Sequence, residues 1–141
     1  MPESRELPDL LQEIKCGEAE AALDALFHLR MKICPQGVAV NQRTAAALPI
    51  LIDIIATNKS VIRKELMQLV VEISRSSHAW RSSARNAQPE YVGNYADKIE
   101  WETAVDRAFE EAMPALARLE SDVEPEVAAM ASGVAGRHRK A

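Results

Sequence analysis

Apolar side chains recur every three or four positions along most of this chain, the spacing that places them on one face of an α-helix. This periodicity predicts six main helices. Their expected ranges are residues 8–15, 18–33, 41–57, 60–73, 99–119 and 124–136. Between residues 76 and 98 neither a helical nor a strand period is sustained, so we expect a long irregular connection there.

Residues that favour helix ends bound these ranges. Gly17 is expected to end the first helix in a left-handed cap, and Asn58 is expected to end the third helix in the same way. Pro35 stops the second helix because it restricts the residue before it and has no amide donor. Ser60 is expected to cap the start of the fourth helix. Short breaks therefore separate the helices, except across residues 76–98.

The composition also indicates an all-α fold. Aromatic residues make up 4% of the chain and glycines number five, whereas Ala, Leu, Glu and Arg are abundant. These are good helix formers, and the β-branched and aromatic residues that strands favour are scarce. With 141 residues, 48% of them hydrophobic, the chain is long enough for one domain with a continuous core over residues 1–141.

Prolines mark a repeated unit. The stretches ALPILIDIIATNKSVI and AMPALARLESDVEPEV align on Pro49 and Pro114, and each continues with an apolar helix and a short polar break. A weaker copy, ELPDLLQEI, contains Pro8. Pro8 and Pro49 are 41 positions apart, whereas Pro49 and Pro114 are 65 apart, and the irregular segment accounts for the difference. A proline that bends or restarts a helix lets the first helix of each unit curve around its partner.

The period near forty residues and the proline placement resemble HEAT repeats, an α-solenoid family in which each helix pair buries its apolar face against adjacent pairs. The middle third of the chain is also similar to a segment of small bacterial HEAT-like proteins. The residues that carry this similarity are Gln36, Gly37, Thr44, Ala45, Ala46, Pro49, Arg63, Glu65 and Leu66.

The resemblance implies an α-α superhelix of about three helical hairpins with a long loop between the second and third. The implied segments are hairpins at 8–34, 41–75 and 99–136, the connection at 76–98 and a basic tail at 137–141. It also implies a scaffold or a partner-binding surface, although a minority of such proteins act on DNA bases or on chromophores.

Four of the six aromatic residues fall between positions 80 and 101, with arginines close by. Tyr, Trp and Arg are enriched at binding hot spots because each combines a large contact area with a polar or charged tip. We therefore predict partner-protein contacts through Trp80, Arg81, Arg85, Tyr91 and Tyr95. The alternative is a private core in which the aromatic residues pin the segment to the helices, and this interpretation suits Trp101 best.

The sequence contains no pattern that predicts catalysis, a metal site or a cofactor. His28, His78 and His138 are far apart, and no carboxylate or cysteine stands at helical ligand spacing to them. The serines around His78 lack the glycine elbow of a nucleophile. Cys16 and Cys34 are expected to be reduced thiols packed as small buried apolar residues. Because no secretory signal or apolar run of about 20 residues is present, we expect a cytoplasmic location and no membrane span.

Charge favours a protein partner over nucleic acid. The net formal charge is -4, and it becomes -7 without the three positive charges of the tail, so the body offers little for phosphate binding. The leading hypothesis is a non-catalytic protein-binding module, an immunity or antitoxin-like factor that blocks a toxic enzyme. It would use the groove lined by the second helices together with residues 76–98. The alternatives are a HEAT-like DNA-glycosylase-type enzyme or nucleic-acid-binding protein, and a self-associating scaffold whose homodimer hides the apolar ends.

Overall fold

A computed structural model describes residues 5–57 and 59–139. All regular secondary structure in these two ranges is helical. The α-helices are α1 (Leu7–Cys16), α2 (Ala19–Ile33), α3 (Thr44–Ala56), α4 (Arg63–Ser76), α5 (Ala79–Arg85), α6 (Ala96–Leu119) and α7 (Pro125–His138), and the 3-10 helices are η1 (Pro35–Gly37) and η2 (Pro89–Tyr95). The predicted cap at Asn58 and the last two tail residues, Lys140 and Ala141, lie outside the described residues. The prediction of an all-α fold is confirmed.

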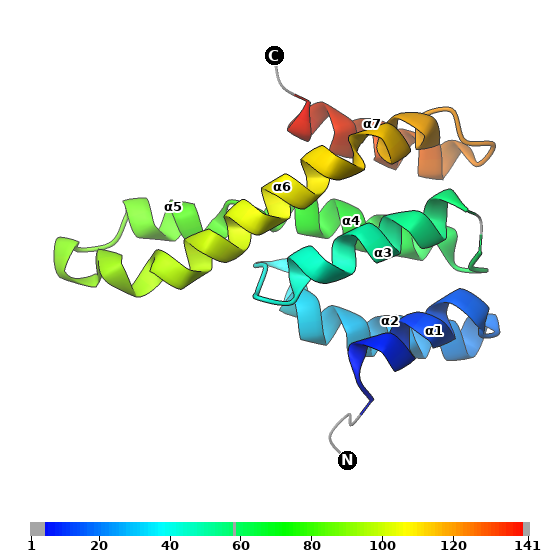
Figure 1. The fold of residues 1–141 in the computed structure, drawn as a ribbon, viewed down its shortest axis with the longest axis horizontal. Coiled ribbons are helices and arrows are strands. Elements are labelled where there is room, and N and C mark those ends of the chain that lie inside the picture. The colour runs from blue at the N-terminus through cyan, green and yellow to red at the C-terminus, as the bar shows by residue number, and fades with distance from the viewer. Residues whose placement is uncertain (1–4, 58, 140–141) are drawn as a thin grey trace.

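Consecutive long helices pack against each other, and so do helices far apart in the sequence. α1 packs on α2, α3 on α4 and α6 on α7, while α3 also packs on α6 and α4 on α7. Figure 1 shows α1 and α2 at one end of the molecule, α3 and α4 in the middle, and α6 and α7 at the other end. The middle helices therefore have neighbours on both sides, which explains the almost wholly apolar sequence of α3.

The core lies between these helices and is dominated by branched aliphatic side chains. Leu48, Leu51 and Ile55 of α3 are fully buried, as are Leu66 and Ile73 of α4. Each such side chain contributes roughly 1.5–3 kcal/mol through its removal from water. Spacings of three, four and seven residues place these side chains on one face of each helix, as the periodicity predicted.

Both internal prolines lie within continuous helices. Pro49 is in α3 and Pro114 is in α6, and the helix runs through each position. Both residues are exposed, and the two helices that contain them make the most extensive helix–helix contact in the described chain. The proline ring thus faces solvent, where a missing backbone hydrogen bond is least costly because water can bind the unpaired carbonyl.

The prediction of an irregular connection at 76–98 is wrong. α4 continues through Ser76, α5 and η2 follow, and α6 already begins at Ala96. In Figure 1 α5 lies beside the amino-terminal half of α6, apart from the other helices. The segment is helical because a carboxylate from α6 binds the first amides of α5, a contact that local periodicity does not reveal.

Three local predictions also need correction. Gly17 is extended (φ -78°, ψ 163°), not left-handed, and a Cβ there would lie 2.5 Å from the Glu13 carbonyl oxygen, so close approach is the reason for glycine. α4 begins at Arg63, and Ser60 instead donates a 2.7 Å hydrogen bond to the Ile14 carbonyl. Cys34 is buried as expected, whereas Cys16 is exposed.

Among the described residues, no helix combines the length and the apolar character that a membrane crossing demands.

Candidate functional site

Trp80 is half-buried, and both its side chain and its backbone amide are held by hydrogen bonds. Its indole Nε1 donates to the Val40 carbonyl at 2.8 Å, and its backbone amide donates to Oε2 of Glu102 at 2.6 Å. The Arg81 amide donates to the other oxygen of Glu102 at 3.0 Å. The fully buried Glu102 carboxylate therefore binds two amides at the start of α5, where a negative charge is favourable.

Arg81 also makes its contacts within the chain. Its guanidinium donates to Asp106 at 2.7 Å and to the Thr103 hydroxyl at 2.9 Å, so both partners lie on α6. His78 approaches the same oxygen of Asp106 at 3.3 Å. The charged tip of Arg81 is thus already satisfied and contributes to the attachment of α5 to α6.

The remaining predicted residues fall into two groups. Tyr95 is half-buried, its ring lies 6.5 Å from that of Trp80, and Lys98 Nζ lies 5.0 Å from the centre of the Trp80 ring. Tyr91 and Arg85 are exposed. The private-core alternative therefore describes Trp80, Arg81 and Tyr95, while partner contact by Arg85 and Tyr91 stays a prediction.

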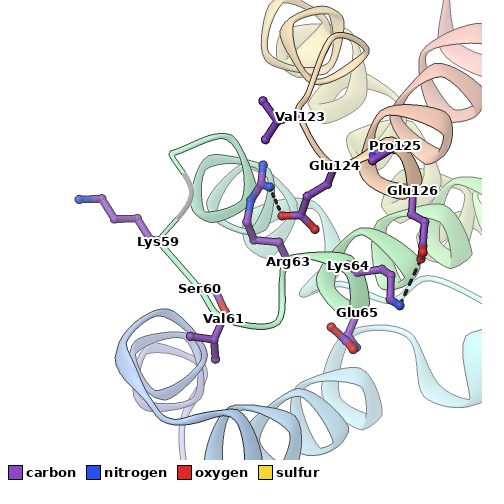
Figure 2. Close-up of a pocket in the computed structure, with 10 residues that line it drawn as sticks. All are labelled: Lys59, Ser60, Val61, Arg63, Lys64, Glu65, Val123, Glu124, Pro125 and Glu126. Carbon is purple, nitrogen blue, oxygen red and sulfur yellow. Dashed lines mark hydrogen bonds and ion pairs between the residues drawn. The ribbon is translucent and has the colours of Figure 1, made fainter.

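A more open surface follows α4 and α7, and three cavities lie along it. We call it the α4–α7 groove. The largest cavity, about 800 Å³, lies where both helices begin. Its walls come from the α3–α4 turn, the α6–α7 turn and the first residues of α4 and α7 (Figure 2). The lining residues are Lys59, Ser60, Val61, Arg63, Lys64, Glu65, Val123, Glu124, Pro125 and Glu126.

Ion pairs neutralise several of the charged side chains that line this cavity. Arg63, with a side chain only 6% exposed, contacts Asp122 at 2.7 Å and Glu124 at 2.6 Å and also donates to the Ile55 carbonyl at 2.9 Å. Hydrogen bonding to Asp122 raises the pKa of Arg63, and the guanidinium lowers the pKa of Asp122. All three acceptors stabilise the charged form of Arg63, so this cation is structural and is not available to a ligand.

Two valines flank the same cavity. Val61 is 68% exposed and Val123 is 92% exposed, which is unusual for residues of this type. Figure 2 shows them on opposite sides of the cavity, one on each turn. Beside them, Lys64 and Glu126 pair at 3.1 Å and can exchange with water or a partner because both are largely exposed. The entrance thus combines apolar contact area with weakly held charges.

The middle of the groove is narrower and more apolar. A cavity of about 230 Å³ is lined by Val71, Arg75, Ala129, Met130, Gly133 and Arg137. A Cβ added at Gly133 would have no atom within 4 Å, so the missing side chain leaves open space between the helices. This cavity can accept an apolar side chain without any rearrangement of the backbone.

The far end of the groove is basic. A cavity of about 340 Å³ is lined by Ser74, Arg75, Ser77, His78, Arg137 and His138. The His138 ring stacks on Phe109 at 4.0 Å and hydrogen-bonds Ser74 at 2.9 Å. Burial lowers the pKa of His138, so its imidazole is neutral near pH 7. The exposed Arg75 and Arg137 provide the positive charge at this end.

The Ser74–His138 contact is poorly suited to nucleophilic catalysis. Ser74 is 4% exposed, and its hydroxyl oxygen also accepts a 3.3 Å hydrogen bond from Arg137. A nucleophilic serine needs access to substrate and a base that a third group orients. The buried Ser74 hydroxyl fits a role in holding α4 to α7 better than a role in catalysis.

Sequence reasoning located this groove only in outline, as a surface lined by second helices. The residues that define it come from turns and helix faces 59 to 64 positions apart, so no local signal pairs them. The alignment on Pro49 and Pro114 contained a usable signal, because it places Val61 and Glu126 at equivalent positions next to the cavity.

Comparisons with known proteins give no match to a family model, to a curated protein or to a solved structure.

Proposed function

We propose that this chain is a non-catalytic protein-binding module built as a short α-superhelix of three HEAT-like hairpins, α1–α2, α3–α4 and α6–α7. The order of helix contacts supports this architecture, because first helices pack on first helices and second helices on second helices across the two later pairs. Pro8, Pro49 and Pro114 all lie in the first helix of a pair, which agrees with a repeated unit.

The observation that carries the proposed function is the row of three cavities between α4 and α7. The α4 residues that line the three cavities run from Lys64 to Arg75, a span of about 17 Å at 1.5 Å per helical residue. It offers exposed valines at one end, an apolar gap in the middle and arginines at the other end. A polypeptide segment matches such a surface, because helical grooves recognise spaced apolar anchors.

The charges specify the partner further. The bound segment would place apolar side chains near Gly133 and carboxylates near Arg75 and Arg137. The partner as a whole would carry a basic face, since the net charge of -4 speeds encounter with a cation-rich surface. An immunity or antitoxin-like role in the cytoplasm would require a partner enzyme with both features: a segment with apolar and carboxylate side chains that enters the groove, and a basic face that meets the acidic remainder of this chain.

The test uses two glycines of α7 that both have room for a side chain but lie inside and outside the groove. Gly133 lines the groove, whereas Gly136 lines none of the cavities described above, and both have open space at the Cβ position. Gly133→Glu introduces a side chain into the groove, and Gly136→Glu adds the same charge and helix propensity outside it.

Each variant and the parent chain would be immobilised and exposed to the proteins of the producing cell, with bound proteins identified by mass spectrometry and their affinities measured by calorimetry. We expect one partner that binds the parent and Gly136→Glu equally and binds Gly133→Glu at least about tenfold more weakly, as a lost apolar contact of roughly 1.5–3 kcal/mol requires. No specific partner, or equal binding by all three chains, would contradict the proposal.

A further inference from the structure

The outward face of α2 carries a row of large apolar side chains. Leu23, Phe27 and Met31 are 43%, 57% and 48% exposed. Their four-residue spacing places them one above another on a single face of the helix. The buried face of α2 is formed by other residues, Ala22, Ala25, Leu26, Leu29 and Ile33. The row therefore lies outside the core, and we call it the α2 stripe.

The position of α2 explains why the stripe stays largely exposed. α2 makes its main contacts with α1 and η1, and Figure 1 shows α1 and α2 at one end of the molecule. The last helix at the opposite end, α7, exposes small residues instead: Ala129, Ser132, Gly133 and Gly136. Among the described helices, α2 thus presents three large apolar side chains on one exposed face, which α7 does not.

The stripe is symmetric about Phe27, since Leu23 stands four residues before it and Met31 four residues after it. A second α2 helix lying antiparallel on the first would place Phe27 against its own copy and Leu23 against Met31 of the other copy. Such an arrangement is isologous, so it closes after two copies and leaves no open end.

Charge along α2 has the same antiparallel complementarity. The acidic side chain of Glu20, seven residues before Phe27 and therefore on the same face, lies at the start of the helix. Its end is basic, with Lys32 beside Arg43 at the rim of a cavity of about 430 Å³ that Met31 also lines. Asp24 adds a negative charge to the first half of α2, and Arg30 adds a positive charge to the second half. Within the chain, Asp24 pairs with Arg5 and Arg30 pairs with Glu72. Antiparallel copies bring acidic starts onto basic ends and oppose the helix dipoles.

We infer that the α2 stripe is a homodimer interface in which two copies of this chain pair antiparallel through α2, with Phe27 at the twofold axis. A contact through one helix is smaller than a standard interface, so we expect a dimer that dissociates on dilution. The interface is separate from the α4–α7 groove, so dimer formation and partner capture can be tested independently.

The first experiment is sedimentation velocity at chain concentrations from about 1 to about 100 µM, a hundredfold range that spans roughly 2.7 kcal/mol of association free energy. The parent should shift from monomer to dimer across this range. Phe27→Asp should weaken the dimer at least about tenfold because it charges the centre of the contact. Tyr91→Asp is the control, since Tyr91 is a similarly exposed aromatic residue away from α2, and it should leave the dimer unchanged.

The second experiment tests the antiparallel geometry by oxidation with diamide in a Cys16→Ser background, which removes the exposed native thiol. Phe27→Cys should form a disulfide dimer. Leu23→Cys alone should not, because its copies would lie about 12 Å apart along the axes, eight residues at 1.5 Å. An equal mixture of Leu23→Cys and Met31→Cys chains should cross-link again.

Circular dichroism would confirm that each variant is folded before these results are compared. A parent chain that stays monomeric at every concentration would overturn the inference, and so would a Phe27→Asp variant that dimerises like the parent. A Leu23→Cys variant that cross-links with itself as readily as Phe27→Cys would overturn the antiparallel arrangement.

Discussion

Two buried charged side chains, Arg63 and Glu102, each join separate segments of the chain. They differ in how far apart in the sequence those segments lie. Arg63 joins the start of α4 to Asp122 and Glu124, which lie 59 and 61 positions away. Glu102 joins α6 to the amides of Trp80 and Arg81, only 22 and 21 positions away. Both groups are satisfied by several partners, as buried charges must be.

The difference separates global stability from local order. The Arg63 network connects the α3–α4 pair to the α6–α7 turn, so it breaks only when the packed body of the molecule opens. The Glu102 network attaches α5, which projects beside the first half of α6 (Figure 1). Its loss can release α5 while the core stays intact. Local opening of this kind is common in structural units with few core contacts.

Arg63→Met should produce the largest effect. It leaves Asp122 partly buried without its cation and removes the hydrogen bond to the Ile55 carbonyl, so unfolding should be easier by about 3 kcal/mol. The urea midpoint followed by circular dichroism measures this change. Lys64→Met is the control, since its exposed pair with Glu126 is screened by water and should shift the midpoint much less. Equal shifts for the two variants would contradict the importance of the Arg63 network.

Glu102→Gln should have a large local effect and a smaller global one. The amide side chain offers one acceptor to two backbone donors, so one buried amide loses its partner at a local cost of roughly 1–3 kcal/mol. Hydrogen exchange should therefore speed up at residues 79–85 more than in α3 or α4. Glu100→Gln, an exposed change on the same helix, should alter neither. Uniformly faster exchange across the whole chain would show that α5 is part of the global unit.

Acid should weaken the Arg63 network. The folded pKa of Asp122 lies below its ordinary value because Arg63 binds the charged form. The unfolded state therefore takes up this proton first, and the stability is present above about pH 4 and is lost as pH falls through the folded pKa. Urea midpoints between pH 6 and about pH 3 should fall more steeply for the parent than for Asp122→Asn. Parallel slopes would contradict this assignment.

A glycine-to-alanine pair should give the smallest effect and sharpen the same contrast. Gly133→Ala in α7 should stabilise the chain by about 0.8–1 kcal/mol through helix propensity, since the added methyl group meets no neighbour. Gly93→Ala in η2 also meets no neighbour, but it should barely move the global midpoint if the α5 region opens separately. An increase of equal size at both positions would argue against separate opening.

The sequence allowed prediction of each long helix because its information is local. The apolar spacing in residues 60–73 and 124–136 reports the buried faces of α4 and α7 directly, and only the ends shift by a few positions. Residues 79–95 lack such a spacing, because Glu102 and Val40 hold this segment from elsewhere in the chain. Its order was therefore missed.

The same limit applied to the candidate site. Aromatic and arginine enrichment identified Trp80 and Arg81 as special, but it could not distinguish an inward contact from an outward one. The groove cavities combine Val61 with Val123 and Arg75 with Arg137, and these pairings depend on how α4 meets α7 in space. Long-range pairing is the information that periodicity and composition leave out.

The central claim is that partner contact occurs in the α4–α7 groove and not on α5. Hydrogen exchange of the chain with and without its captured partner tests this claim most directly. We predict slower exchange in the α3–α4 turn, at residues 59–63, and in the α6–α7 turn and the first turn of α7, at residues 121–129, with no change at residues 79–95. Protection confined to residues 79–95 would contradict the account and would assign binding to the segment that contains Arg85 and Tyr91.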